Sequence, residues 1–139
     1  MPLELSTLDL GEREMLGEFP IDVVLLATDL DASRDFYANK IGLEIESDTP
    51  YAVQFKCGGG SRLGVSKSTV GTADTQTQAA FRVKDIAAEL AVLRSRGVKI
   101  EDYDMPGLKT VDGVAEVPFG LMAWFIDPGQ NCVGIIQLK

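Results

Sequence analysis

Hydrophobic positions alternate along two stretches of the chain, residues 21–28 and 78–84, and each stretch leads into a helical pattern that ends at a glycine. A period of two is typical of a strand with one buried face. The alternating apolar residues are Val23, Leu25 and Ala27 in the first stretch and Ala79, Phe81 and Val83 in the second. Because strand, helix and glycine recur in the same order, the pattern predicts a duplicated structural unit.

The two helices are predicted over residues 29–40 and 85–96. Asp29 or Asp31 is a suitable N-cap for the first and Asp85 for the second, since an aspartate side chain accepts hydrogen bonds from free amides of the first turn. In the second helix the apolar residues that share one face, and are therefore expected to be buried, are Ile86, Leu90 and Leu93.

Further strands complete each half of the chain. They are predicted over residues 42–47, 51–57 and 63–65 in the first half and over 98–103, 114–117, 121–126 and 132–138 in the second. The run Gly58-Gly59-Gly60 predicts a tight turn, and residues 104–113 a long loop that either covers a cleft or simply connects two strands. The sequence therefore predicts an α+β fold of two tandem βαβββ modules, which form a curved mixed sheet around a central cleft with the helices outside.

The size and charge of the chain argue for one domain and against two classes of partner. The chain has 139 residues, of which 45% are hydrophobic and 24% charged, so one globular domain is expected. The net charge of −8 argues against nucleic acid and anionic membranes as partners, because both attract clustered lysine and arginine. The absence of a recognisable signal peptide or membrane span predicts a cytoplasmic protein.

The acidity is concentrated near the start of the chain. Residues 1–19 combine five acidic side chains with several leucines, and Pro20 separates them from the first strand. This segment is predicted to be an arm that packs on the body of the protein or reaches a partner subunit. The domain proper is predicted over residues 20–139, with modules at about 20–68 and 77–139.

The residue inventory excludes several mechanisms. The chain has no histidine, so Ser-His-Asp and Cys-His nucleophile systems are excluded. Cys57 and Cys132 have neither a disulfide framework nor metal-ligand spacing and are expected to be unreactive. General acid–base chemistry by Asp22, Glu116 or Tyr103 would require these residues to converge on one cleft.

A set of spaced residues resembles one family. The residues are Asp29-Leu30, Ser33, Phe36-Tyr37 and Ile41-Gly42-Leu43, followed near the end of the chain by Asp127-Pro128 and Asn131. In this order and within a duplicated unit, they are similar to the vicinal oxygen chelate superfamily, which contains glyoxalases, bleomycin-resistance proteins and extradiol dioxygenases. The resemblance implies the tandem βαβββ fold, and it implies a homodimer because many relatives assemble their modules across two chains.

The resemblance also indicates where a metal would bind. The positions that hold ligands in metal-dependent relatives are occupied here by Asp22, Gly64, Gln78 and Gly134. Two glycines supply no ligand, whereas a catalytic divalent site needs about three protein ligands. Asp22 and Gln78 are at most weak candidates for a hydrated Mg²⁺ or Mn²⁺, and otherwise bind water, a ligand or each other; no tightly held metal or other cofactor is predicted.

Strand alternation and the repeat together predict the wall of a small-molecule pocket. The candidate ligand-binding residues are Asp22, Val24, Gln54, Gln78, Arg82, Met122 and Trp124. Trp124 corresponds to a ligand-contacting position in similar fosfomycin-resistance proteins, although ordinary core packing would also explain it.

The favoured interpretation is a metal-free binder of a small organic molecule, of the bleomycin-resistance type. One alternative is a metal-dependent lyase, isomerase or dioxygenase of the glyoxalase type. Another is a regulatory or interaction protein that uses the acidic arm as its contact surface.

Overall fold

The computed structural model describes residues 15–72 and 76–139. A short helical turn, η1 (Leu16–Glu18), precedes the first module. The elements of that module are β1 (Asp22–Ala27), α1 (Leu30–Asp35), η2 (Phe36–Ile41), β2 (Glu44–Asp48), β3 (Ala52–Lys56), η3 (Gly58–Gly60) and β4 (Arg62–Lys67). Those of the second are β5 (Thr77–Arg82), α2 (Ile86–Ser95), β6 (Asp104–Met105), β7 (Leu108–Lys109), β8 (Ala115–Val117), β9 (Gly120–Ile126) and β10 (Cys132–Leu138).

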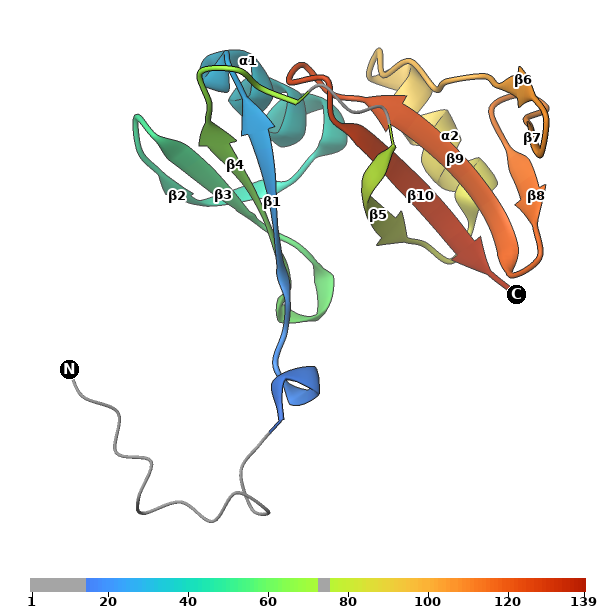
Figure 1. Cartoon of the computed structure of the whole chain (residues 1–139), viewed down its shortest axis with the longest axis horizontal. Coiled ribbons are helices and arrows are strands. Elements are labelled where there is room, and N and C mark those ends of the chain that lie inside the picture. Colours follow the sequence, from blue (N-terminus) through green and yellow to red (C-terminus); the bar gives the residue numbers. More distant parts are fainter. Residues whose placement is uncertain (1–14, 73–75) are drawn as a thin grey trace.

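The two modules have the same topology. The first sheet has the strand order β1-β4-β3-β2 and the second β5-β10-β9-β8, so the first strand of each module pairs in parallel with its last strand. Figure 1 shows two separate sheets, with α1 beside the first sheet and α2 against the β9–β10 pair. The α+β class and the tandem βαβββ architecture are confirmed.

Both helices begin and end as their sequences predict. The side chains of Asp29 and Asp85 accept hydrogen bonds from the backbone amides of Ala32 and Ala88, each at 3.1 Å. Gly42, with φ of 87°, closes the first helix in the left-handed conformation that glycine adopts without strain. The first helix widens into a π-helical turn, η2, before it reaches this glycine.

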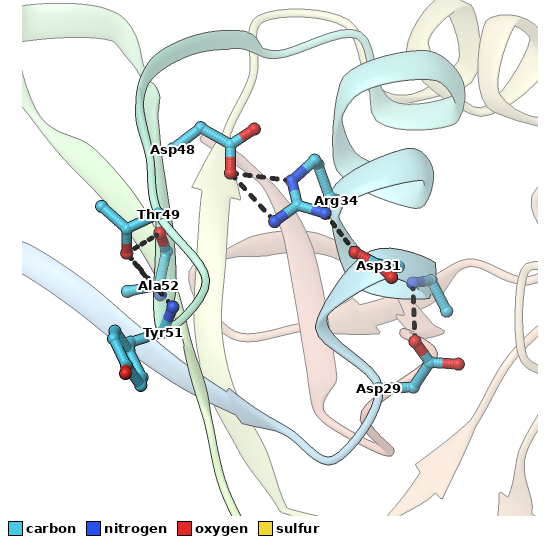
Figure 2. Close-up of polar contacts among 8 residues, drawn as sticks. Asp29, Asp31, Arg34, Asp48, Thr49, Tyr51 and Ala52 are labelled. Atoms are coloured by element: carbon cyan, nitrogen blue, oxygen red, sulfur yellow. Dashed lines mark hydrogen bonds and ion pairs between the residues drawn. The ribbon is translucent and has the colours of Figure 1, made fainter.

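A polar cluster fixes α1 against the tip of the β2–β3 hairpin (Figure 2). The guanidinium of Arg34 donates to Asp31 on its own helix and, at 2.9 Å, to Asp48 at the end of β2. The Thr49 hydroxyl closes the turn that follows, since it accepts from the backbone amide of Ala52 at 3.1 Å. These contacts hold the hairpin in a fixed position relative to the helix.

One hydrophobic core joins the modules. The helix-facing side of the first sheet contributes Val53 and Phe55, and that of the second contributes Phe125 and Ile135. The rings of Phe36 and Phe125 lie 5.7 Å apart between their centroids, so η2 packs directly on the second sheet. Because the core is continuous, the two modules are expected to fold as one unit.

A buried polar network also crosses between the modules. The Tyr37 hydroxyl donates to Oδ2 of Asp127 at 2.7 Å, and the Asp127 carboxylate accepts from the backbone amide of Asn131 at 2.8 Å. The Asn131 side chain in turn donates to the Leu26 carbonyl at 2.8 Å. The aspartate and asparagine of the family-like motif therefore connect the two halves of the fold.

The structure departs from the predicted strands at one place. Residues 98–103 have no strand assignment, although Val98 and Ile100 are buried and the amide of Glu101 donates to the Trp124 carbonyl at 2.9 Å. The predicted loop that follows contains the short β6–β7 hairpin, which turns at Pro106 and Gly107. Of the predicted arm, residues 1–14 lie outside the described part of the chain.

Candidate functional site

The first module leaves one face of its sheet open. The side chains of this open face, opposite α1, belong to Asp22, Val24 and Leu26 of β1, Ala52, Gln54 and Lys56 of β3, and Arg62, Gly64 and Ser66 of β4. Val24 is 61% exposed and Leu26 38% exposed, whereas Leu25 and Ala27 on the helix-facing side are buried. Exposed apolar side chains that lie together on one face of a sheet indicate an interaction surface.

Polar groups on the open face fall into two kinds. Arg62 is paired with Glu46 at 2.7 Å, and Lys56 with Glu44 at 3.5 Å. Within the described residues, by contrast, no hydrogen bond or ion pair engages the carboxylate of Asp22 or the amide of Gln54. Both groups are therefore free to bind a ligand that carries hydrogen-bond donors.

Gly64 lies between Val24 and Gln54 on the open face and carries no side chain of its own. It is aligned with Val24 on one side and with Gln54 on the other. A Cβ atom at this position would have no neighbour closer than 3.6 Å, the carbonyl oxygen of Val23. The backbone conformation here does not require glycine, so the missing side chain creates room on the open face.

On the corresponding face of the second module, the part around Trp124 is covered by the same chain, whereas Arg82 remains exposed. Trp124 is only 7% exposed, because Tyr103 and Leu108, from the segment around the β6–β7 hairpin, pack on it. The rings of Tyr103 and Trp124 meet edge to face with centroids 5.6 Å apart. The loop predicted over residues 104–113 thus lies over the aromatic side chain predicted to contact ligand.

A β-bulge in β5 changes which of its residues lies beside Trp124. Cys132 is aligned with Thr77 and Val133 with Ala79, so Gln78 is the extra residue. Thr77 consequently takes the place beside Trp124 that simple alternation gives to Gln78, and its hydroxyl accepts from the indole N–H at 2.9 Å. Gln78 is exposed, and its side-chain oxygen accepts from the backbone amide of Cys132 at 3.2 Å. Strict alternation therefore fails at Gln78, and sequence reasoning missed Thr77.

The two glycines at predicted ligand positions have different surroundings. A Cβ atom at Gly134 would meet the side chains of Met122, Thr77 and Ala80 at 3.3 to 3.5 Å. An added carbon at Gly134 would therefore be more crowded than one at Gly64, whose nearest neighbours would lie at 3.6 to 3.9 Å.

The ionisable groups beside Trp124 are held neutral. Burial raises the pKa of the Cys132 thiol, and burial together with the neighbouring Cys132 and Glu101 raises the pKa of the Tyr103 hydroxyl. Burial also raises the pKa of Cys57 in the first module. A thiol with a raised pKa is a poor nucleophile at neutral pH, so neither cysteine is set up for covalent chemistry.

Few side-chain atoms at the predicted metal positions can coordinate a metal ion. Asp22 offers a carboxylate, the Gln78 oxygen already accepts a backbone hydrogen bond, and Gly64 and Gly134 offer none. Over residues 15–72 and 76–139, the structure brings together no group of three or more histidine, cysteine, aspartate or glutamate side chains that could hold a metal ion. This donor set does not fit a catalytic divalent cation with three protein ligands.

Comparison with known proteins identifies the family of this chain. The sequence model of the Glyoxalase/Bleomycin resistance protein/Dioxygenase superfamily matches residues 21–131. The chain belongs to this superfamily. A search of curated proteins found no match. Among the described residues, no helix is long and apolar enough to cross a bilayer.

Solved structures of superfamily members resemble the chain over most of its length. A bleomycin-binding protein from Streptomyces verticillus, complexed with copper(II)-bleomycin, is 25% identical with a TM-score of 0.70 and covers 90% of this chain and 100% of its own. TnmS3, an antibiotic binding protein from Streptomyces sp. CB03234, is 22% identical with a TM-score of 0.69 and respective coverages of 91% and 100%. A lactoylglutathione lyase from Agrobacterium tumefaciens is 21% identical with a TM-score of 0.62 and coverages of 86% and 93%. These superfamily structures include both binding proteins and an enzyme.

The predicted site residues fall into two groups in the structure. Asp22, Val24 and Gln54 share the open face of the first module. Arg82, Met122 and Trp124 share one face of the second, because Ile136 is aligned with Arg82 and Met122 and Gly134 with Trp124. Since Val24 remains 61% exposed, the second module of the same chain does not cover the first group.

Proposed function

We propose that this protein binds a small organic molecule on the open face of its first module, without a tightly held metal ion. The observation that carries the proposal is the combination, on one face, of exposed Val24 and Leu26 with the unengaged polar groups of Asp22 and Gln54 around Gly64. An apolar surface with a few polar groups that fix orientation is typical of small-molecule sites. The antibiotic-binding proteins among the similar structures support this class of ligand.

The ligand expected here has an apolar body and at least one hydrogen-bond donor. The apolar body would lie over Gly64 against Val24 and Leu26, where the missing side chain leaves space. A donor such as an amine or amide would bind the carboxylate of Asp22 or the side-chain oxygen of Gln54. The net charge of −8 favours a cationic over an anionic ligand.

A homodimer would complete the binding site. The open face needs a cover that its own second module does not provide, and a second copy of the chain offers one in a two-fold symmetric arrangement. The face that carries Arg82 and Met122 has exposed or half-buried side chains suited to this contact. The cleft would then lie between two chains, with each chain contributing one wall.

Ligand binding is tested by a thermal-shift screen of antibiotics and metabolites, bleomycin included, on the full chain. A compound present at about one hundred times its dissociation constant adds about 2.7 kcal/mol to the free energy of unfolding and raises Tm by several degrees. We expect Gly64→Val to weaken binding by at least about tenfold, because the new side chain occupies the free space. Gly58→Val, at a glycine of η3 that has no atom within 4 Å of an added carbon, is the matched control. Failure of every compound to shift Tm, or equal binding by Gly64→Val, would refute the proposal.

The metal-free state is tested by elemental mass spectrometry. Protein exposed in turn to Mn²⁺, Ni²⁺, Zn²⁺ and Fe²⁺ and then desalted is expected to retain far less than one metal ion per chain, because its donor set lacks a third ligand. Near-stoichiometric metal that disappears in an Asp22→Ala/Gln78→Ala double variant would contradict this expectation. That outcome would favour a metal-dependent lyase, isomerase or dioxygenase.

A further inference from the structure

A pocket lies between the two modules, on the opposite side of the sheets from the open face. The first module contributes Ile41 and Leu43 to it, and the second sheet contributes Phe81, Phe125 and Ile135. Helix α2 completes the pocket with Leu93 and Glu89. This helix-side pocket therefore lies where the two modules meet, away from the surface assigned to the proposed ligand.

The pocket is apolar and has the volume of a single ring. It measures about 130 Å³, and every lining residue except Glu89 has an apolar side chain. An apolar cavity of about 150 Å³ in another protein stays dry and binds benzene, so a space of this size suits one six-membered ring. Phe125 and Ile135 form a buried floor, whereas Ile41, Phe81 and Val83 are only half-buried, which leaves the pocket open to solvent on one side.

Glu89 gives the pocket a charge preference. Its side chain is exposed and lies one helical turn before the buried Leu93, so the carboxylate is at the mouth while Leu93 lines the interior. The nearby Arg96 guanidinium is directed to the carbonyls of Lys40 and Ile41, at 3.5 and 3.3 Å. Among the described residues that line the pocket, Glu89 is thus the one ionisable side chain, and it favours a cation.

We propose that the helix-side pocket binds a single-ring amine, with the ring between Phe81 and Leu93 and the protonated amino group beside Glu89. The site is separate from the proposed ligand site and does not depend on it. Because its walls come from both modules, an occupant would contact both and stabilise their packing.

The probe is benzylamine, which is titrated at pH 7 into the full-length protein. The methyl groups of isoleucine, leucine and valine are isotopically labelled, and their chemical shifts are followed by NMR. We expect chemical-shift changes at Ile41, Leu93 and Ile135, with tighter binding of benzylamine than of toluene or benzoate. Glu89→Gln should weaken benzylamine binding about three- to fivefold and leave toluene unchanged, as expected for loss of one exposed ion pair. Val83→Phe should weaken both by filling the pocket.

Glu116→Gln is the matched control, since it removes an exposed carboxylate from β8, outside this pocket. Shift changes at Val24 and Leu26 instead of the pocket residues would overturn the proposal, as would benzoate binding as tightly as benzylamine. Equal weakening by Glu89→Gln and Glu116→Gln would also overturn it, because a general charge effect would then explain the preference. Shift changes at Ile41, Leu93 and Ile135 report the helix-side pocket whether or not Val24 and Leu26 also shift, so the two proposals can fail separately.

Discussion

Ionisation of Tyr37 is expected to lower the stability of the protein at alkaline pH. Its ring is fully buried and its hydroxyl donates to Asp127. Burial, together with the adjacent Asp127 carboxylate, strongly raises the pKa of Tyr37. The folded protein therefore retains the phenol proton to a higher pH than the unfolded chain does. The resulting stabilisation is complete below the unfolded tyrosine pKa of about 10 and declines as pH rises above it.

We expect the free energy of unfolding to fall by about 1.4 kcal/mol per pH unit above pH 10 from this residue alone. The Tyr37→Phe variant should not show this fall in the free energy of unfolding above pH 10. At pH 7 the variant should be less stable than wild type by about 1–3 kcal/mol, because Asp127 loses a buried hydrogen-bond donor. Urea denaturation between pH 7 and pH 11 measures both effects. Tyr51→Phe, at a tyrosine that is 77% exposed, serves as control. Parallel pH profiles for Tyr37→Phe and wild type would show that Tyr37 is not responsible.

At the scale of elements, the turn that begins at Asp127-Pro128 fits against the end of β1 through Gly129. The Gln130 amide donates to the Asp127 carbonyl at 3.0 Å, which closes a tight turn. A Cβ atom on Gly129 would lie 2.4 Å from the Leu26 carbonyl oxygen, which belongs to the other module. Since both sides of this contact are backbone, neither can rotate away as a flexible side chain would.

Gly129→Ala is accordingly expected to destabilise the protein by about 3 kcal/mol, because the turn must move away from β1 and strain the Asn131–Leu26 hydrogen bond. Chemical denaturation with circular dichroism measures the loss. Gly58→Ala, where no atom lies within 4 Å of the added carbon, should change stability little. A near-neutral Gly129→Ala would mean that the modules tolerate a looser contact than the structure has.

At the scale of the whole molecule, the exposed apolar side chains of the open face predict self-association. Light scattering coupled to size exclusion is expected to give about twice the chain mass of 15.0 kDa. Val24→Glu should shift the protein to the monomer without unfolding it, because Val24 is already exposed in the single chain and a charge there opposes burial. Val70→Glu, at a valine 85% exposed outside the open face, is the control. A monomeric wild type, or an unchanged mass for Val24→Glu, would contradict the dimer.

Local sequence signals predicted the module architecture but only part of the candidate site. Period-two alternation, Asp29 and Asp85 as N-caps, and Gly42 as a helix end all act within a few residues, so they can be recognised directly from sequence. The bulge at Gln78 arises from pairing with β10, more than fifty residues later, and no local signal marks it. The cover over Trp124 likewise depends on Tyr103, which approaches only because residues 98–103 follow an irregular path.

The strand order of the second sheet also bears on how the nascent chain folds. β10 lies between β5 and β9, so translation supplies its neighbours first and the strand that joins them last. Until β10 emerges, β5 has no partner in its sheet, and Leu26 in the first module lacks the donor that Asn131 provides just before β10. Before residues 131–138 emerge, the second sheet lacks β10 and the first module lacks the Asn131 contact. We therefore expect protease resistance to appear abruptly once these residues are available rather than module by module.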